Sequence, residues 1–143
     1  MLLIAAIVLL AMILIVIGVA IGFQSHLQGM DDQLRLDAVD CEAVKKKLHE
    51  VDRMLASDQL RFAVIEADKL LHFVVKEMLY EGQPIEDHLE SVREYETRFE
   101  GIPEASSFAQ RLQEQPSTPI DAQTAGRTVE TYHRALKRLG VLN

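Results

Sequence analysis

The chain of 143 residues has little of what enzymes commonly use for chemistry. It contains one cysteine, Cys41, which cannot form an internal disulfide or supply a cysteine metal cluster. Asp40 and Glu42 flank this thiol and disfavour its thiolate form, so we interpret Cys41 as structural. There is no GxxxxGK(S/T) phosphate loop, no GxGxxG after a strand, no HExxH and no GxSxG elbow. We therefore predict no catalytic residue, no bound metal and no cofactor.

Charged, amide and hydroxyl side chains are absent from residues 2–23, which read LLIAAIVLLAMILIVIGVAIGF. A helix of these 22 residues reaches about 30 Å, the thickness of the hydrocarbon core of a bilayer. No polar stripe runs along it, which excludes an amphipathic helix lying on the membrane surface. We predict a single transmembrane anchor at residues 1–23, with the lipid bilayer as a partner.

A cleaved signal peptide is the alternative for this run. Such peptides have a basic n-region and a shorter apolar core of about 7–15 residues. No Lys or Arg precedes the run, yet Ala20, Ile21 and Gly22 fit a small-x-small cleavage site. A secreted bundle released after Gly22 therefore stays open as an alternative.

The charges that follow the run indicate its orientation. Arg35 comes first, and Lys45, Lys46 and Lys47 follow. Basic residues close to a span favour the cytoplasmic side, whereas acids count for little. We expect a single-pass protein of the cell membrane with its folded domain in the cytoplasm.

Gly18 and Gly22 form a GxxxG pair within the predicted anchor. Such a pair lets two membrane helices approach closely, although small residues are also common in membrane helices by chance. A homo-oligomer, or another protein partner, is therefore expected. Nucleic acid is disfavoured, because the net charge of −7 repels phosphate backbones.

The remainder of the chain has the pattern of an all-α domain. No window alternates with period two, whereas apolar residues recur at helical spacing. Five helices are expected, at about 41–55, 58–80, 84–100, 103–114 and 119–139. We predict a juxtamembrane connector at 24–39, then a small antiparallel bundle of four to five helices at 40–143. The second helix is the most apolar, so we expect it at the centre.

Several residues are expected to begin these helices. Asp40 is a candidate N-cap for the first, and Ser57 or Asp58 for the second. Pro103 fits the first turn of the fourth helix. Thr118 and Asp121 have the spacing of a capping box, which would place the fifth helix from Pro119 onward.

The histidines do not have the spacing of a metal site. No two of the five are three or four residues apart, which excludes a histidine pair on one helix face. Asp68 and His72 are four apart, and we interpret them as a hydrogen-bonded pair on a helix surface. Glu66 and Lys69 are likewise expected to form a solvated pair.

Two stretches resemble HEPN-type helical domains, including membrane-anchored bacterial versions. They are AVIEADKLLHFVVKEMLYEGQPIEDHL at 63–89, which is similar to the first helix pair, and TVETYHRALKRLG at 128–140, which is similar to the final helix. The resemblance covers about residues 58–140 and implies an all-helical bundle.

Ribonuclease members of that family carry an arginine, usually followed by a polar residue, and a histidine four to six positions later. The resemblance places Arg111 at the arginine, but Leu112 follows it, and Gln115, Pro116 and Ser117 occupy the histidine window. Glutamine cannot transfer a proton at neutral pH, so the nuclease centre is degenerate.

We therefore predict a non-catalytic interaction or scaffolding module at the membrane. The alternative is a HEPN-class nuclease or toxin–antitoxin-like effector with a non-standard active site. Its candidate residues would be Arg111, His133 and His72.

Overall fold

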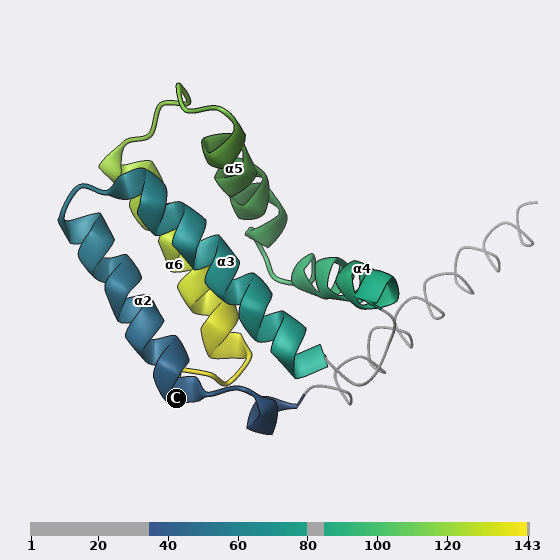
Figure 1. Ribbon diagram of the computed structural model, residues 1–143. Coiled ribbons are helices and arrows are strands. Elements are labelled where there is room, and N and C mark those ends of the chain that lie inside the picture. The colour runs from purple at the N-terminus through teal and green to yellow at the C-terminus, as the bar shows by residue number, and fades with distance from the viewer. Residues whose placement is uncertain (1–34, 80–84, 143) are drawn as a thin grey trace, which may run out of the picture. The chain divides into compact units, whose positions relative to one another are not determined.

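A computed structural model describes residues 35–79 and 85–142, and every regular element in these ranges is a helix (Figure 1). The elements are η1 (Leu36–Ala38), α2 (Cys41–Ala56), α3 (Leu60–Leu79), α4 (Ile85–Glu96), α5 (Ile102–Glu114) and α6 (Ala122–Arg138). The predicted all-α class and helical bundle are confirmed for this part of the chain.

The predicted anchor at residues 1–23 lies outside the described residues, as do Gly18 and Gly22. None of the helices within 35–79 and 85–142 has both the length and the apolarity that crossing a bilayer requires. The compact helical unit begins at Arg35. Within the predicted connector, the Arg35 amide donates to the carbonyl of Met78 at 3.0 Å, and Val39 is buried.

Helix α3 occupies the centre of the bundle, as its apolar sequence predicts. It packs against α2, α4, α5, α6 and η1, and α2 and α6 lie beside it in Figure 1. Its buried side chains are Ala63, Val64, Ile65, Ala67, Leu70, Leu71, Val74, Val75, Met78 and Leu79. Because these residues cover more than one face, α3 is buried by several neighbours at once.

Asp40 caps α2 as predicted, since its carboxylate accepts the Ala43 amide at 3.1 Å. The prediction that Ser57 or Asp58 begins the next helix is wrong. Ser57 is the C-cap of α2 and its hydroxyl donates to the carbonyl of Arg53 at 2.8 Å. Asp58 is in the left-handed region at φ 64°, so it reverses the chain before α3 starts.

Helix α4 ends at Glu96, several residues before the expected end near Gly101. Gly101 instead precedes α5 at φ 80°, and a Cβ there would lie 3.1 Å from Thr131 Cγ2. Glycine thus meets both the backbone angle and the close approach of α6. Pro103 lies in the first turn of α5, as predicted.

Helix α6 begins at Ala122, so the predicted capping box at Thr118 and the helical Pro119 are wrong. Asp121 is the N-cap, because its carboxylate accepts the Thr124 amide at 2.8 Å and the Thr124 hydroxyl at 3.1 Å. The Thr118 carbonyl accepts a hydrogen bond from Arg61 at 2.7 Å. Thr118 therefore belongs to the loop before α6, where α3 holds it.

Candidate functional site

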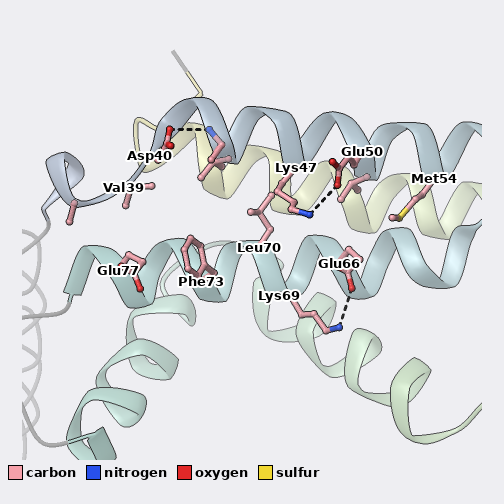
Figure 2. Close-up of a pocket in the computed structure, with 14 residues that line it drawn as sticks. Val39, Asp40, Lys47, Glu50, Met54, Glu66, Lys69, Leu70, Phe73 and Glu77 are labelled. Carbon is pink, nitrogen blue, oxygen red and sulfur yellow. Dashed lines mark hydrogen bonds and ion pairs between the residues drawn. The ribbon is translucent and has the colours of Figure 1, made fainter.

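An apolar groove of about 490 Å³ runs between α2 and α3 (Figure 2). Its apolar lining is Ala38, Val39, Ala43, Val44, Val51, Met54, Leu70 and Phe73. Val44, Val51 and Met54 on α2 are seven and three residues apart, and Leu70 and Phe73 on α3 are three apart, so each set shares a face. The groove is thus the seam of the α2–α3 pair, left open on one side.

An ion pair lies along each helix that borders the groove. On α2, Lys47 Nζ lies 3.1 Å from Glu50 Oε2, and on α3, Lys69 Nζ lies 3.0 Å from Glu66 Oε1 (Figure 2). The second pair was predicted from the sequence. Such exposed pairs contribute little to stability, so their charges stay available to a partner.

Phe73 stands at the groove with 52% of its surface exposed. Phe62, which is 60% exposed, lies on the same row of α3 because 62, 66, 69 and 73 have helical spacing. Phe62 does not line the groove. The two phenylalanines therefore differ in what lies beside them, which makes them a matched pair for experiments.

A polar cleft of about 670 Å³ lies on another face of α3, between α4 and α5. Its lining includes Asp68, His72, Arg93, Glu96 and Ser106. His72 Nδ1 lies 3.1 Å from Glu96 Oε1, which joins α3 to α4. With Glu114, which also lines it, the cleft combines an imidazole, three carboxylates and a guanidinium group.

Burial favours the uncharged form of both His72 and Glu96. Burial raises the pKa of Glu96 to about 7, with the nearby charge of Asp68 adding to the rise and Arg93 opposing it. Burial also lowers the pKa of His72. A large fraction of Glu96 is protonated near neutral pH, so Glu96 is positioned to exchange a proton with His72.

Asp68 joins three helices beneath this contact. Its Oδ1 accepts the Ser106 hydroxyl of α5 at 2.7 Å and the Tyr132 hydroxyl of α6 at 2.8 Å. Tyr132 is fully buried, and its pKa is raised mainly by this burial and then by the charge of Asp68. The predicted hydrogen-bonded pair of Asp68 and His72 is thus replaced by two contacts to other helices.

The three candidate residues of the enzyme alternative lie in three different places. His72 lines the polar cleft, whereas Arg111 is exposed on α5 with its guanidinium group 5.6 Å from the centre of the Phe108 ring. His133 Nε2 lies 3.1 Å from Asp52 Oδ1 of α2. Across residues 35–79 and 85–142, no three His, Cys, Asp or Glu side chains form a group that could hold a metal ion.

Two residues make contacts between helices that no local sequence pattern indicates. Glu96 has the ordinary position of a charge near a helix end, and its burial comes from tertiary packing, in which α4 lies against α3. Arg61 donates to the carbonyls of Leu112, Gln115, Pro116 and Thr118. These partners are more than 50 positions away, so no local pattern could reveal them.

Comparisons with protein-family models, with curated proteins and with solved structures found no match. The resemblance to HEPN-type domains stays a prediction.

Proposed function

We propose that this chain is a single-pass membrane protein whose helical domain, on the cytoplasmic side, acts by contact and not by catalysis. The uninterrupted apolar run at residues 2–23 supports the anchor. The observation that carries the contact role is the open α2–α3 groove with the half-exposed Phe73 at its border. An aromatic side chain beside an apolar groove is typical of an interface anchor.

A second copy of the chain is the partner that fits this groove best. The groove is bordered by charges of both signs, one lysine–glutamate pair along each helix. A twofold axis brings identical surfaces together, so a lysine of one copy can meet a glutamate of the other. Phe73 of each copy would then enter the apolar groove of its partner.

Tethering provides the mechanism. Two copies held in one bilayer meet at a high effective concentration, so a modest contact suffices for pairing. The GxxxG pair at Gly18 and Gly22 offers a second contact within the bilayer. The paired domains would form a small acidic helical scaffold at the membrane surface.

The experiment compares two phenylalanine variants of the full chain in native membranes. Phe73→Ser removes the side chain at the groove, and Phe62→Ser removes a somewhat more exposed one outside it. Cross-linking followed by electrophoresis measures the dimer. We expect Phe73→Ser to reduce the dimer by about tenfold, the effect of losing one interface anchor, and Phe62→Ser to leave it unchanged. Recovery of only free monomer from the wild-type chain would refute the proposal.

An enzyme of the HEPN class, or a toxin–antitoxin-like effector, is the second candidate. The polar cleft favours it, because Glu96 with a pKa of about 7 lies beside His72 and Arg93. A proton donor matched to neutral pH and a nearby guanidinium group suit phosphoryl chemistry. Arg111 and His133 do not reach this cleft in the present arrangement.

Turnover assays separate the two candidates. The full chain in detergent is incubated with RNA and with nucleotides, alongside His72→Ala, Arg111→Ala and His133→Ala. Turnover that disappears in His72→Ala alone would identify the cleft as the active site. Turnover that disappears in Arg111→Ala or His133→Ala would place the active site at those residues instead. The contact proposal predicts no turnover by any of these proteins.

The secreted alternative has a direct measurement of its own. Cleavage after Gly22 would remove the apolar run and release the bundle. The intact mass of the mature protein distinguishes this product from the anchored chain that we propose.

A further inference from the structure

Three arginines form a row along the exposed face of α6. Arg127, Arg134 and Arg138 are all exposed and lie seven and four residues apart. At 100° per residue they fall within about 40° of one another on the helix, and the row is about 16 Å long. The buried residues of α6 are Ala125, Val129, Tyr132, Ala135 and Leu136. All but Ala135, which lies on the flank, occupy the side of the helix opposite the row. The row therefore faces away from the core.

These guanidinium groups keep their charge available. Within residues 35–79 and 85–142, no carboxylate lies at ion-pair distance from any of the three. Arg134 donates to the Thr131 hydroxyl at 3.3 Å, a neutral partner that does not compensate its charge. The acids nearby are Glu130 on α6, Asp121 at its N-cap, and Glu100 and Glu104 in the hollows beside the row.

The lysine cluster of α2 provides a contrast. Lys45, Lys46 and Lys47 form the densest basic run in the sequence. In the structure, Lys45 pairs with Glu42 and Lys47 with Glu50, each at 3.1 Å. The adjacent lysines are thus largely compensated. The arginines that are scattered in the sequence align with no carboxylate at ion-pair distance among the described residues, although the Arg127 charge acts on Asp121 from farther away.

We propose that the row of Arg127, Arg134 and Arg138 docks onto anionic lipid headgroups and turns this face of the domain toward the bilayer. This inference rests on the proposed membrane anchor. The chain carries a net charge of −7, so an anionic surface repels the domain as a whole and attracts this row. Guanidinium groups also bind phosphate oxygens through two hydrogen bonds at once.

Because the predicted anchor holds the domain at the membrane, a row of three arginines is sufficient to orient it. Residues 24–34 separate the predicted anchor from Arg35, and 11 residues span at most about 40 Å when extended. The domain is therefore confined near the headgroups, where a few basic residues decide which face is turned inward. The α2–α3 groove lies on helices other than α6, so docking would leave it accessible to a second copy.

The test uses the full chain in lipid nanodiscs, with Cys41→Ser as background. A fluorophore is attached to Gln123→Cys, which is exposed near the start of the row, or to His49→Cys, which is exposed on α2. Neutral phosphatidylcholine discs are compared with discs that also contain phosphatidylglycerol. A nitroxide on the headgroup of a trace lipid quenches the fluorophore when the two are close.

We expect strong quenching at Gln123→Cys in the anionic discs, weak quenching in the neutral discs, and weak quenching at His49→Cys in both. Salt at 1 M, where the Debye length is about 3 Å, should abolish the difference. The triple change R127Q/R134Q/R138Q should lower the ratio of docked to free domain by roughly a hundredfold. The matched change K45Q/K46Q/K47Q removes as many charges and should keep the docking.

Three kinds of outcome would overturn the inference. Equal quenching in neutral and anionic discs, or equal loss in both triple variants, would show that the row does not choose the lipid surface. A response of the Gln123→Cys label to RNA or polyglutamate, without one to anionic lipid, would assign the row to another polyanion or acidic partner. A chain that enters neither disc would refute the anchor as well, which distinguishes that failure from the first two.

The wild-type comparison of the two lipid compositions keeps the test valid if the triple arginine variant folds poorly. Circular dichroism reports on this directly. Because all three arginines are exposed, we expect the variant to melt as the wild type does.

Discussion

Helix α3 borders an apolar groove on one face and a polar cleft on another, and the two regions are held together differently. Beside the groove, each charged pair lies within one helix, Lys47 with Glu50 and Lys69 with Glu66. In the cleft, the polar contacts join different helices, as Asp68 does with Tyr132. The groove therefore stabilises the fold mainly through its apolar lining, whereas the polar contacts of the cleft connect the helices to one another.

This difference separates a surface that can bind from a surface that supports the domain. Exposed pairs within one helix can exchange partners at small cost. Buried contacts between helices cannot, because an abandoned polar group loses its hydrogen bond without regaining water. Substitutions in the two regions should therefore differ in their effect on stability.

The largest effect is expected for Asp68→Ala, which removes the acceptor of Ser106 and of the fully buried Tyr132. We expect the free energy of unfolding to fall by about 3 kcal/mol, because two hydroxyl donors lose their shared carboxylate acceptor in the interior. Glu66→Ala, on the groove side, should change it by less than about 0.5 kcal/mol. Urea denaturation followed by circular dichroism measures both. Equal losses would mean that the two faces contribute alike.

The next effect concerns the N-terminal end of α3, where Arg61 donates to four carbonyl oxygens around the loop before α6. Arg61→Ala should lower the free energy of unfolding by about 2 kcal/mol and expose residues 115–121 to protease. Arg61→Lys should recover little, because a single ammonium group lacks the fork of donors. Limited proteolysis with mass spectrometry locates the cut. Full recovery by lysine would indicate that only the charge matters.

The fold was largely predictable from local patterns, and the misplaced boundaries have a common cause. Asp40 and Pro103 act through neighbours within a few residues, so their roles could be read from the sequence. Thr118 has the spacing of a cap but is held by Arg61 from another helix. Asp121 caps α6 instead. The contact between Arg61 and Thr118 joins residues far apart in the sequence, so a local pattern does not indicate it.

The candidate sites were less predictable than the fold. His72 and Asp68 have a spacing that indicates a contact on one helix, yet each finds its hydrogen bond on a different helix. The role of Glu96 depends on burial by α3, which no spacing within α4 reports. The groove is different, since the helical row containing Phe62 and Phe73 could have been noticed as exposed aromatic residues.

A third prediction uses pH to test the cleft. Burial raises the pKa of Glu96 from 4.5 to about 7 in the folded protein. The folded state therefore binds this proton more tightly than the unfolded state, and its contribution to stability is lost as pH rises from about 4.5 to about 7. The lowered pKa of His72 acts in the opposite direction below 6.5, which reduces the net effect.

Glu96→Gln removes the titration and should flatten this dependence. Between pH 6 and pH 8 we expect the wild type to lose about 1.3 kcal/mol relative to the variant. Urea denaturation at several pH values measures the difference. Glu130→Gln, which changes an exposed carboxylate of α6 outside the cleft, is the control and should run parallel to the wild type. Parallel curves for Glu96→Gln and the wild type would show that Glu96 is ionised throughout.

The smallest effect on stability is expected at the groove. Phe73→Ser removes a side chain that is 52% exposed, so the unfolding free energy of the monomer should change by less than about 0.5 kcal/mol. Val74→Ala truncates its buried neighbour, which is 0% exposed, and should lower the free energy of unfolding by about 2 kcal/mol. Both are measured by urea denaturation of the detergent-solubilised chain, diluted until cross-linking recovers only monomer. A loss at Phe73 as large as that at Val74 would mean that the phenyl ring supports its own domain and that the groove is not kept open for a partner.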